Sequence, residues 1–229
     1  MLEAGIDDWR LFLNLAIPLV LAVPADSPYS SFAELLAAFR DDPGVIEVAT
    51  AGVGSHGHSA MEQIRRHTNL DYRHLAFAGA DAAVTAAAAG KADAVLQLSV
   101  ETADMLRAGK LRALTVLARV PLELEGYGTV PPISDTIPGF KPAAVYYGIF
   151  IPRGVPWKVI DSLGRIWDEQ VKSSAALRSF ASANGLLFDP EWGPEARELA
   201  FPMIQLEAWR HYETGKAAVS PGSAGIPRP

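Results

Sequence analysis

The chain has 229 residues, of which 49% are hydrophobic and 20% charged, as in a globular protein with room for one large domain or two small ones. Its formal charge of −6 and the lack of any lysine or arginine block make nucleic acid an unexpected partner. Cysteine is absent, which excludes disulfides and thiolate chemistry. The longest apolar run, residues 11–23, is too short to span a membrane and lacks the flanks of a signal peptide. We therefore expect a protein that is not embedded in a membrane.

The first half of the chain alternates between predicted strands and helices. Residues 16–23 (AIPLVLAV) indicate a buried strand, and Ser31 with Glu34 forms an S-x-x-E capping box that opens a helix. Further strands are expected at residues 45–50, 73–77, 92–99 and 111–117, with helices between them. This alternation predicts a doubly wound α/β unit with parallel strands, in which ligands bind at the carboxyl ends of the strands.

The pattern changes after residue 117. Residues 119–142 carry five prolines and three glycines and indicate a long loop. A buried strand is expected at residues 144–152, followed by helices over residues 157–173, 175–184 and 194–213 and then by a tail of low apolar content. The helical periodicity resumes here without further alternation with strands.

These elements predict one complete α/β lobe and part of another. Residues 24–142 form the complete lobe, and residues 216–229 a flexible tail. Residues 1–23 are a remnant of the first lobe with a crossing strand, and residues 143–215 supply the return strand and its C-terminal helices. Because two strands make a poor independent sheet, they either extend the central sheet or belong to a second domain that is incomplete in this sequence. Two crossing strands would allow the lobes to close over a ligand.

The turn between the second strand and its helix carries the first functional signal. It reads TAGVGSHGHSAMEQIRR from Thr50 onward. Backbone N–H groups at the start of the helix have no intrahelical partner, and the helix dipole adds positive charge there. Gly52 and Gly54 allow the backbone to approach a ligand, and the Ser55 hydroxyl can cap the helix or donate to the ligand. A carboxylate fits such a turn without a lysine.

Other interpretations of this turn remain open. Glycine and serine also make ordinary turns. Gly52, Gly54 and Gly57 match the dinucleotide pattern G-x-G-x-x-G, but no acidic residue ends the next predicted strand. No Lys-Ser/Thr pair follows, which excludes a P-loop. A nucleophile elbow around Ser55 would need glycine where Val53 stands.

A metal site at His56, His58 and Glu62 is a further alternative. His58 and Glu62 lie one helical turn apart, whereas His56 is directed elsewhere at the start of the helix. No other cluster of ligating side chains converges on them in the sequence. We therefore favour a hydrogen bond from His58 that orients the turn.

A second turn repeats the design. In AFAGADAA a strand ends at Phe77, Gly79 bends the chain, and residues 80–82 open a helix with free N–H groups. Asp81 is expected to cap its own helix, and Phe77 to wall the pocket. An ordinary strand-to-helix loop is again the rival interpretation. Tyr146 and Tyr147 lie where the return strand would meet the cleft, so either could donate to a ligand or pack in the core.

These segments, taken in order, resemble a known family. ATAGVGSHGH resembles the A-x-A-G-x-G-S-x-x-H motif of the periplasmic receptors of tripartite tricarboxylate transporters, the Bug or TctC-like family. AFAG, GKLRALTV, IPGF and YYGIFIPRGVP follow in the family's order. The resemblance implies a type II periplasmic-binding-protein fold, a small carboxylic acid as ligand, and delivery of that acid to the membrane permease subunits of a tripartite transporter. It also implies a periplasmic location, and no catalytic residue, cofactor or metal.

The resemblance places one ligand loop in the first turn and another in the second. The expected ligand-binding residues are Thr50, Gly52, Gly54, Ser55, His58, Phe77, Ala78, Gly79, Ala80 and Tyr147. Tyr146 stands where the family has tryptophan, and Ala78 where it has lysine. The family's early ligand loop in the first lobe has no counterpart in this sequence. The alternative functions are an α/β enzyme for a small anionic substrate, with His58 as general base, and an interaction module that has lost ligand binding.

Overall fold

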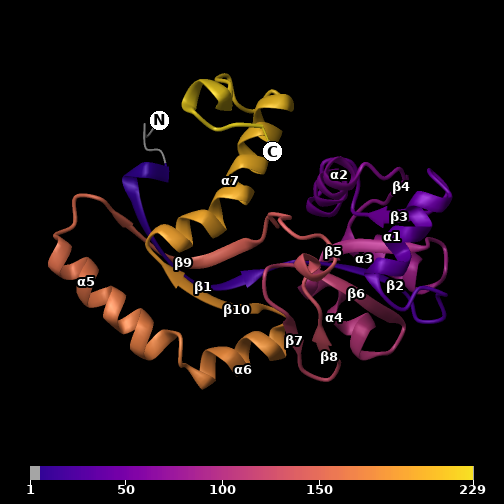
Figure 1. The fold of residues 1–229 in the computed structure, drawn as a ribbon, viewed down its shortest axis with the longest axis horizontal. Coiled ribbons are helices and arrows are strands. Elements are labelled where there is room, and N and C mark those ends of the chain that lie inside the picture. The colour runs from indigo at the N-terminus through magenta and orange to yellow at the C-terminus, as the bar shows by residue number, and fades with distance from the viewer. Residues whose placement is uncertain (1–5, 229) are drawn as a thin grey trace.

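Pro18 divides the apolar run near the N-terminus into two strands that belong to different sheets. In the computed structural model, which describes residues 6–228, β1 (Trp9–Ile17) lies in a three-stranded sheet and β2 (Leu19–Pro24) in a five-stranded sheet. Proline has no backbone N–H to continue a ladder, so the chain passes from one sheet to the other at this point. The single strand predicted for residues 16–23 is therefore wrong, because it spans the junction between two strands. Figure 1 shows the two sheets as separate lobes joined by extended segments.

The second lobe is built on the five-stranded sheet. Its remaining regular elements up to the end of the sheet are α1 (Phe32–Asp41), β3 (Glu47–Thr50), α2 (His56–Thr68), β4 (Arg73–Ala76), α3 (Ala80–Ala88), β5 (Ala94–Leu98), α4 (Ser99–Arg107) and β6 (Leu111–Leu117). The strand order is β4-β3-β5-β2-β6. β3 is parallel to β4 and β5, as predicted, but β2 is antiparallel to β5 and β6. The prediction of an all-parallel sheet is wrong for β2, because this strand enters from the other lobe and runs against its neighbours.

Helices cover both faces of this sheet. The α1 face is typical: Phe32, Leu35, Leu36 and Phe39 recur at helical spacing and are at most 5% exposed. Burial of each such side chain stabilises the fold by about 1.5–3 kcal/mol. α2 packs in the same apolar core as α1, whereas α3 and α4 pack in the core on the opposite face. α2, α3 and α4 begin at the carboxyl edge of β3, β4 and β5, which faces the other lobe, whereas α1 follows the antiparallel β2 at the opposite edge.

Residues 119–142 are more regular than the predicted loop. They contain the hairpin of β7 (Leu122–Leu124) and β8 (Gly128–Val130), followed by a 3-10 turn at Ile133–Asp135. Leu122, Leu124 and Val130 are buried in the core beneath α4. Strands of this length give too little alternation to be recognised beside so many prolines and glycines.

The first lobe contains the three-stranded sheet β10-β1-β9. Its elements are β9 (Val145–Pro152), α5 (Trp157–Ile166), a π-helical turn at Trp167–Val171, α6 (Ala175–Asn184), β10 (Leu187–Trp192) and α7 (Pro194–Glu213). β1 is central and antiparallel to both neighbours. The pieces that flank the complete lobe thus form a separate sheet instead of extending the central one.

The two faces of the first-lobe sheet have their own cores. Phe12 packs with Ile160 and Trp167 on the α5 face, and Leu11 and Leu13 pack on α7. The expectation that residues 144–152 form a buried strand is wrong for most of β9, where residues 147–150 are all exposed. The cause is that β9 is an edge strand within the described residues, paired with β1 alone.

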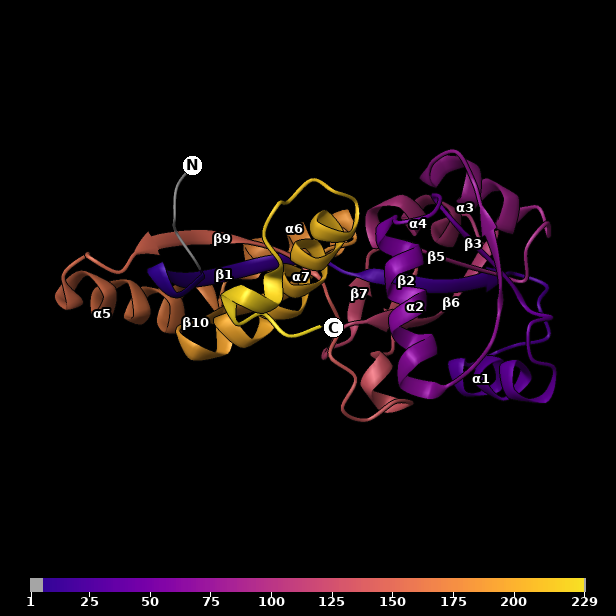
Figure 2. The same cartoon turned by 90° about the horizontal axis from the view of Figure 1, so that it is seen from above.

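The C-terminal residues fold back along α7 instead of forming the flexible tail expected for residues 216–229. Pro221–Ala224 forms a 3-10 helix, and the Trp209 indole donates to the carbonyl of Pro227 over 2.7 Å. The Arg228 guanidinium lies over the Trp209 ring. Figure 2 shows this returning segment beside α7. The ends of the predicted terminal segments, residues 1–5 and 229, lie outside the described residues.

Candidate functional site

The two predicted ligand loops meet at the carboxyl edge of the second-lobe sheet. The Phe77 N–H donates to the carbonyl of Thr50 over 2.9 Å, which ties the start of the second loop to the end of β3. Gly52 has a φ of +110°, and a Cβ there would lie 3.3 Å from the Phe77 carbonyl oxygen. A side chain would therefore be strained and crowded, and glycine allows the two loops to pack together.

The opening of α2 has three satisfied amides and two without an acceptor in the described part of the chain. Ser55 caps the helix, since its Oγ accepts from the His58 amide over 3.2 Å. The Gly54 amide donates to His58 Nδ1 over 3.2 Å, and the Ser55 amide to the Gly52 carbonyl. The expected turn-orienting role of His58 is thus confirmed. The amides of His56 and Gly57 donate to no acceptor within residues 6–228.

These contacts change the expected contribution of each group in the first loop. Gly54 offers no free N–H to a ligand, because His58 already accepts it. The Ser55 hydroxyl uses its oxygen as a helix cap, which leaves its hydrogen available for donation. An anion at this helix start would be held by the amides of His56 and Gly57 and by that hydroxyl.

The opening of α3 has no side-chain cap. Gly79 is the N-cap residue, and the expected capping by Asp81 is wrong, because no side chain accepts from the first amides of this helix. The Ala83 amide donates to Gly79, whereas those of residues 80–82 have no acceptor in the described part of the chain. Gly79 and Ala80 are half-buried, and Ala78 is exposed. Phe77 is partly buried against the α3–α4 core.

Two carboxylates lie near this edge and weaken its positive potential. The Glu101 carboxylate accepts from the Leu98 amide over 3.1 Å at the start of α4. Burial raises the pKa of Glu101, and the nearby Asp81 charge adds to that rise, whereas His56 opposes it. A bound anion would thus be attracted by the amides and repelled by two acids.

A stack of two histidines supports the first loop from beneath. Thr50 is fully buried, and its Oγ1 lies 2.6 Å from His74 Nε2. The His58 and His74 rings stack with their centroids 4.3 Å apart. Burial, and then the neighbouring His58, lower the pKa of His74. Thr50 therefore positions the loop from below instead of facing a ligand.

Sequence reasoning missed His74. Its only signal is strand register: His74 pairs with Val48 in the parallel ladder, which puts it on the same face as Thr50 two residues further along β3. Such a diagonal contact becomes visible only when the pairing of β3 with β4 is known.

The structure does not bring Tyr147 to the two loops. Gly54 and His58 line a cavity of about 270 Å³ between α2 and the α7 segment, together with Trp209. Tyr147 is 50% exposed and lines a different cavity of about 590 Å³ against α4 and α6. Tyr146 donates to Asp189 over 3.0 Å. The ligand role expected for Tyr147 therefore has no geometric support.

Gly57 and Glu62, on which the dinucleotide and metal interpretations depend, both have roles in the packing of α2. A Cβ at Gly57 would lie 1.9 Å from the Leu96 carbonyl oxygen, so this glycine allows α2 to approach β5. Glu62 accepts from Arg65 over 2.9 Å and from Tyr72 over 2.9 Å. In residues 6–228 no group of three histidine, aspartate or glutamate side chains is placed to hold a metal ion.

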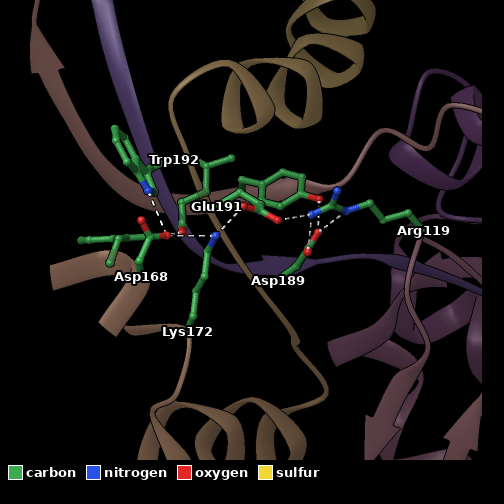
Figure 3. Close-up of polar contacts among 9 residues, drawn as sticks. Arg119, Asp168, Lys172, Asp189, Glu191 and Trp192 are labelled. Carbon is green, nitrogen blue, oxygen red and sulfur yellow. Dashed lines mark hydrogen bonds and ion pairs between the residues drawn. The ribbon is translucent and has the colours of Figure 1, made fainter. Parts of the chain in front are cut away.

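An ion-pair network connects the lobes, and no sequence motif indicates it (Figure 3). Arg119, just after β6, donates through Nε and Nη2 to the Asp189 carboxylate of β10 over 3.2 and 2.8 Å. Asp189 is 6% exposed and also accepts from Tyr146 of β9. The hydrogen bonds to Asp189 raise the pKa of Arg119, and burial beside that carboxylate raises the pKa of Tyr146. The second lobe is thus attached to the first-lobe sheet through a buried charge.

The network continues along the first lobe. Arg119 also contacts Glu191 over 3.1 Å, and Glu191 pairs with Lys172 over 3.0 Å. Lys172 contacts Asp168 over 3.1 Å, which accepts from the Trp192 indole. Figure 3 shows these side chains as one row from Arg119 to Asp168, which lies in the π-helical turn after α5. The position of Arg119 is therefore coupled to the packing of the π-helical turn.

Within residues 6–228, none of the helices combines the length and the apolarity needed to cross a lipid bilayer. Two α/β lobes, each with a crossing strand that is antiparallel to its neighbours, define a type II periplasmic-binding-protein fold. A solved solute-binding protein of the TctC type from Polaromonas matches with a TM-score of 0.65 and 22% identity, over 94% of this chain and 72% of that one. MatC from Rhodopseudomonas palustris with bound malate matches with a TM-score of 0.58 and 22% identity, over 89% of this chain and 68% of that one. R. palustris Rpa4515 with adipate matches with a TM-score of 0.58 and 19% identity, over 100% of this chain and 73% of that one. These likenesses establish the fold.

The sequence establishes the family. The model of the tripartite tricarboxylate transporter family receptor (TctC) matches residues 5–201, so the chain belongs to this family. A protein encoded between tcbD and tcbE in Pseudomonas sp. strain P51 is 33% identical over 155 residues, which is 66% of this chain and 45% of that protein. Protein BugT of Bordetella pertussis is 26% identical over 167 residues, or 72% of this chain and 50% of that protein. The chain thus spans about half the length of these curated relatives.

Proposed function

We propose that this protein is a solute-binding receptor that holds a small carboxylic acid at the edge where α2 and α3 begin. The observation that carries the proposal is the pair of adjoining helix starts, where the amides of His56, Gly57 and residues 80–82 have no acceptor within residues 6–228. Each helix start favours negative charge, and the contact between Phe77 and Thr50 holds the two starts side by side.

The family supports a carboxylate as the ligand class. One solved neighbour is described with malate and another with adipate. A carboxylate presents two acceptor oxygens to amide donors, which the α2 start and the Ser55 hydroxyl supply. The acids at Asp81 and Glu101 favour a ligand whose second charged group lies away from them.

Delivery to a membrane permease and a periplasmic location are further parts of the proposal. They rest on membership in the family of tripartite tricarboxylate transporter receptors. In this proposal the protein performs no covalent step. Its work is binding, followed by movement of the lobes about the crossings at Pro18 and at residues 142–144.

The proposal is tested by thermal shift and calorimetry with malate, adipate and the neutral diamide of adipate. We expect the acids to raise the melting temperature in a saturable way and the diamide to have no effect, because only the carboxylate complements the helix starts. Ser55→Ala removes a donor and a cap and should weaken acid binding by about 1–3 kcal/mol, or roughly 5- to 150-fold. Ser223→Ala, in the C-terminal turn, is the matched control and should bind as the wild type does. Equal responses to acid and diamide would contradict the proposal.

A further inference from the structure

A cavity of about 410 Å³ lies in the first lobe, on the side turned away from the second lobe. It is lined by the start of β1, the end of β10, the segment after β9, and the first residues of α5 and α7. Figure 1 shows the carboxyl ends of β9 and β10 on this side. Gly54 and His58 of the proposed acid site line a different cavity. The volume falls in the range of pockets that bind small molecules.

The charged side chains of this cavity are mostly positive. They belong to Asp7, Arg10, Arg153 and Arg197. Arg197 forms an ion pair with Asp7, whereas Arg10 and Arg153 form none within residues 6–228. Glu195, in the first turn of α7, lines a neighbouring cavity instead. The cavity therefore attracts anions, although the chain as a whole has a formal charge of −6.

Arg10 is held in place and lacks an acceptor. Its guanidinium lies over the Trp157 ring, 5.2 Å from the ring centroid. Its Nε is buried and has no hydrogen-bond partner in the described part of the chain. A buried donor on a charged group costs free energy when it lacks an acceptor, and hydrogen bonds from a guanidinium to a carboxylate are among the stronger ones. An anion beside Arg10 would supply the missing acceptor.

The start of α7 adds positive potential to the same cavity. Gly193 lines the cavity and is the N-cap residue of this 20-residue helix, with no side-chain cap. The Arg197 amide donates to the Gly193 carbonyl over 3.2 Å, whereas the amides of Glu195 and Ala196 have no acceptor among residues 6–228. Pro194 has no amide hydrogen to satisfy. The helix dipole therefore acts on an anion together with the arginines.

Three indole rings give the cavity its apolar surface. Trp9, Trp157 and Trp192 all line it, and Trp157 is 60% exposed. Indoles offer flat apolar faces that pack well against another planar ring. A small inorganic anion would leave these faces in contact with water. The combination of arginines and indoles therefore favours an anion that carries a planar apolar body.

We propose that this cavity is a second ligand site, which binds an aromatic carboxylate. The carboxylate would lie between Arg10, Arg153 and the start of α7, and the aromatic ring would pack against the indoles of Trp9 and Trp157. The site is separate from the edge where α2 and α3 begin, so the proposal does not depend on solute binding there.

The test follows the tryptophan indole N–H groups by ¹H–¹⁵N NMR during titration with benzoate, up to about 10 mM. We expect saturable shifts of the Trp157 indole, with the neutral benzamide and the non-aromatic acetate at least about tenfold weaker. Equal responses to benzoate and benzamide would overturn the proposal. Shifts confined to the Trp209 indole, which lines the cavity beside α2, would also overturn it, since they would assign benzoate to the other site.

Matched variants locate the site, and circular dichroism checks that each one folds. Arg10→Gln should weaken benzoate binding at least about tenfold. Arg178→Gln is the matched control, because its guanidinium also lies over a ring, that of Phe188, but outside the cavity. This control and Ser55→Ala should bind as the wild type does.

Arg153→Gln gives a second measurement at an exposed position, where a change of fold is not expected. It should weaken benzoate binding about two- to fivefold, because an exposed charge contributes less than a buried one. Wild-type affinity in both Arg10→Gln and Arg153→Gln would overturn the proposal, and so would an equal loss in Ser55→Ala.

Discussion

Replacing Arg119 by alanine tests the interlobe network most severely. The change removes both hydrogen bonds from Arg119 to Asp189, at 2.8 and 3.2 Å, and leaves that carboxylate with Tyr146 as its remaining side-chain partner. Asp189 is only 6% exposed, so its charge depends on protein partners. Breaking a buried pair from one side costs about 3–5 kcal/mol.

The expected cost lies at the lower end of that range. Arg119 itself has a side chain that is 42% exposed, so part of its charge is already screened by solvent. We therefore expect a loss of about 3 kcal/mol in the free energy of unfolding, which lowers the melting temperature of a chain of this size by roughly 6–12 °C. Circular dichroism during thermal and urea unfolding measures both quantities.

Two further variants control the interpretation. Arg165→Ala breaks an exposed pair with Asp161 at 3.6 Å, where the side chains are 66% and 55% exposed, and should cost no more than about 1 kcal/mol. The double variant Arg119→Leu with Asp189→Leu should recover most of the loss, because no buried charge is left unpaired. An Arg119→Ala protein within about 0.5 kcal/mol of the wild type would refute the view that this network holds the lobes together.

Three other predictions concern the site. Gly57→Ala places a Cβ 1.9 Å from the Leu96 carbonyl and should lower stability by about 1–3 kcal/mol in urea unfolding; a neutral effect would contradict the close packing of α2 on β5. The pKa of His74 is lowered from 6.5, so the unfolded chain binds a proton more readily. The contribution of His74 to the free energy of unfolding should therefore be fully present above about pH 6.5 and be lost as the pH drops below it. His74→Gln should make the melting temperature depend less on pH between about pH 7.5 and 5.5. Ser55→Thr keeps the hydroxyl and should retain acid affinity, whereas an affinity as low as that of Ser55→Ala would show that shape, not hydrogen bonding, matters at that position.

Much of the second lobe could be predicted from local patterns. One of the two hydrogen bonds of the predicted capping box forms, because the Ser31 Oγ accepts from the Glu34 amide. The Glu34 carboxylate accepts from the amide of Ser30 instead of that of Ser31. The two strand-to-helix turns were recognised because glycine and serine have local reasons to be there. Such signals depend on a few neighbouring residues, so they survive without knowledge of the tertiary structure.

The first lobe could be predicted less well, because its features depend on distant partners. β10 has the sequence LFDPEW, in which proline and two acids hide the strand, and its pairing with β1 stabilises it. The exposure of β9 could not be inferred from an apolar run, which predicts burial whether or not a neighbouring strand is present. Apart from Pro18, residues 16–23 likewise contain no sign that their two halves enter different sheets.

The site was predicted at the level of the loops but not of the individual groups. Both helix starts were located correctly, whereas the capping of α3 by Asp81 and the position of Tyr147 were not. His74 and Arg119 act through partners that are 24 and 70 residues away in the sequence. Long-range pairs of this kind carry no periodicity, so only a folded structure identifies them.

The most direct test of the receptor account follows backbone amides by ¹H–¹⁵N NMR during titration with adipate, up to about 10 mM so that a millimolar complex is detected. The account predicts saturable shifts at His56, Gly57 and residues 80–82, with no response to the neutral diamide. Amides at both helix starts that stay unmoved, or shifts confined to another surface, would contradict it.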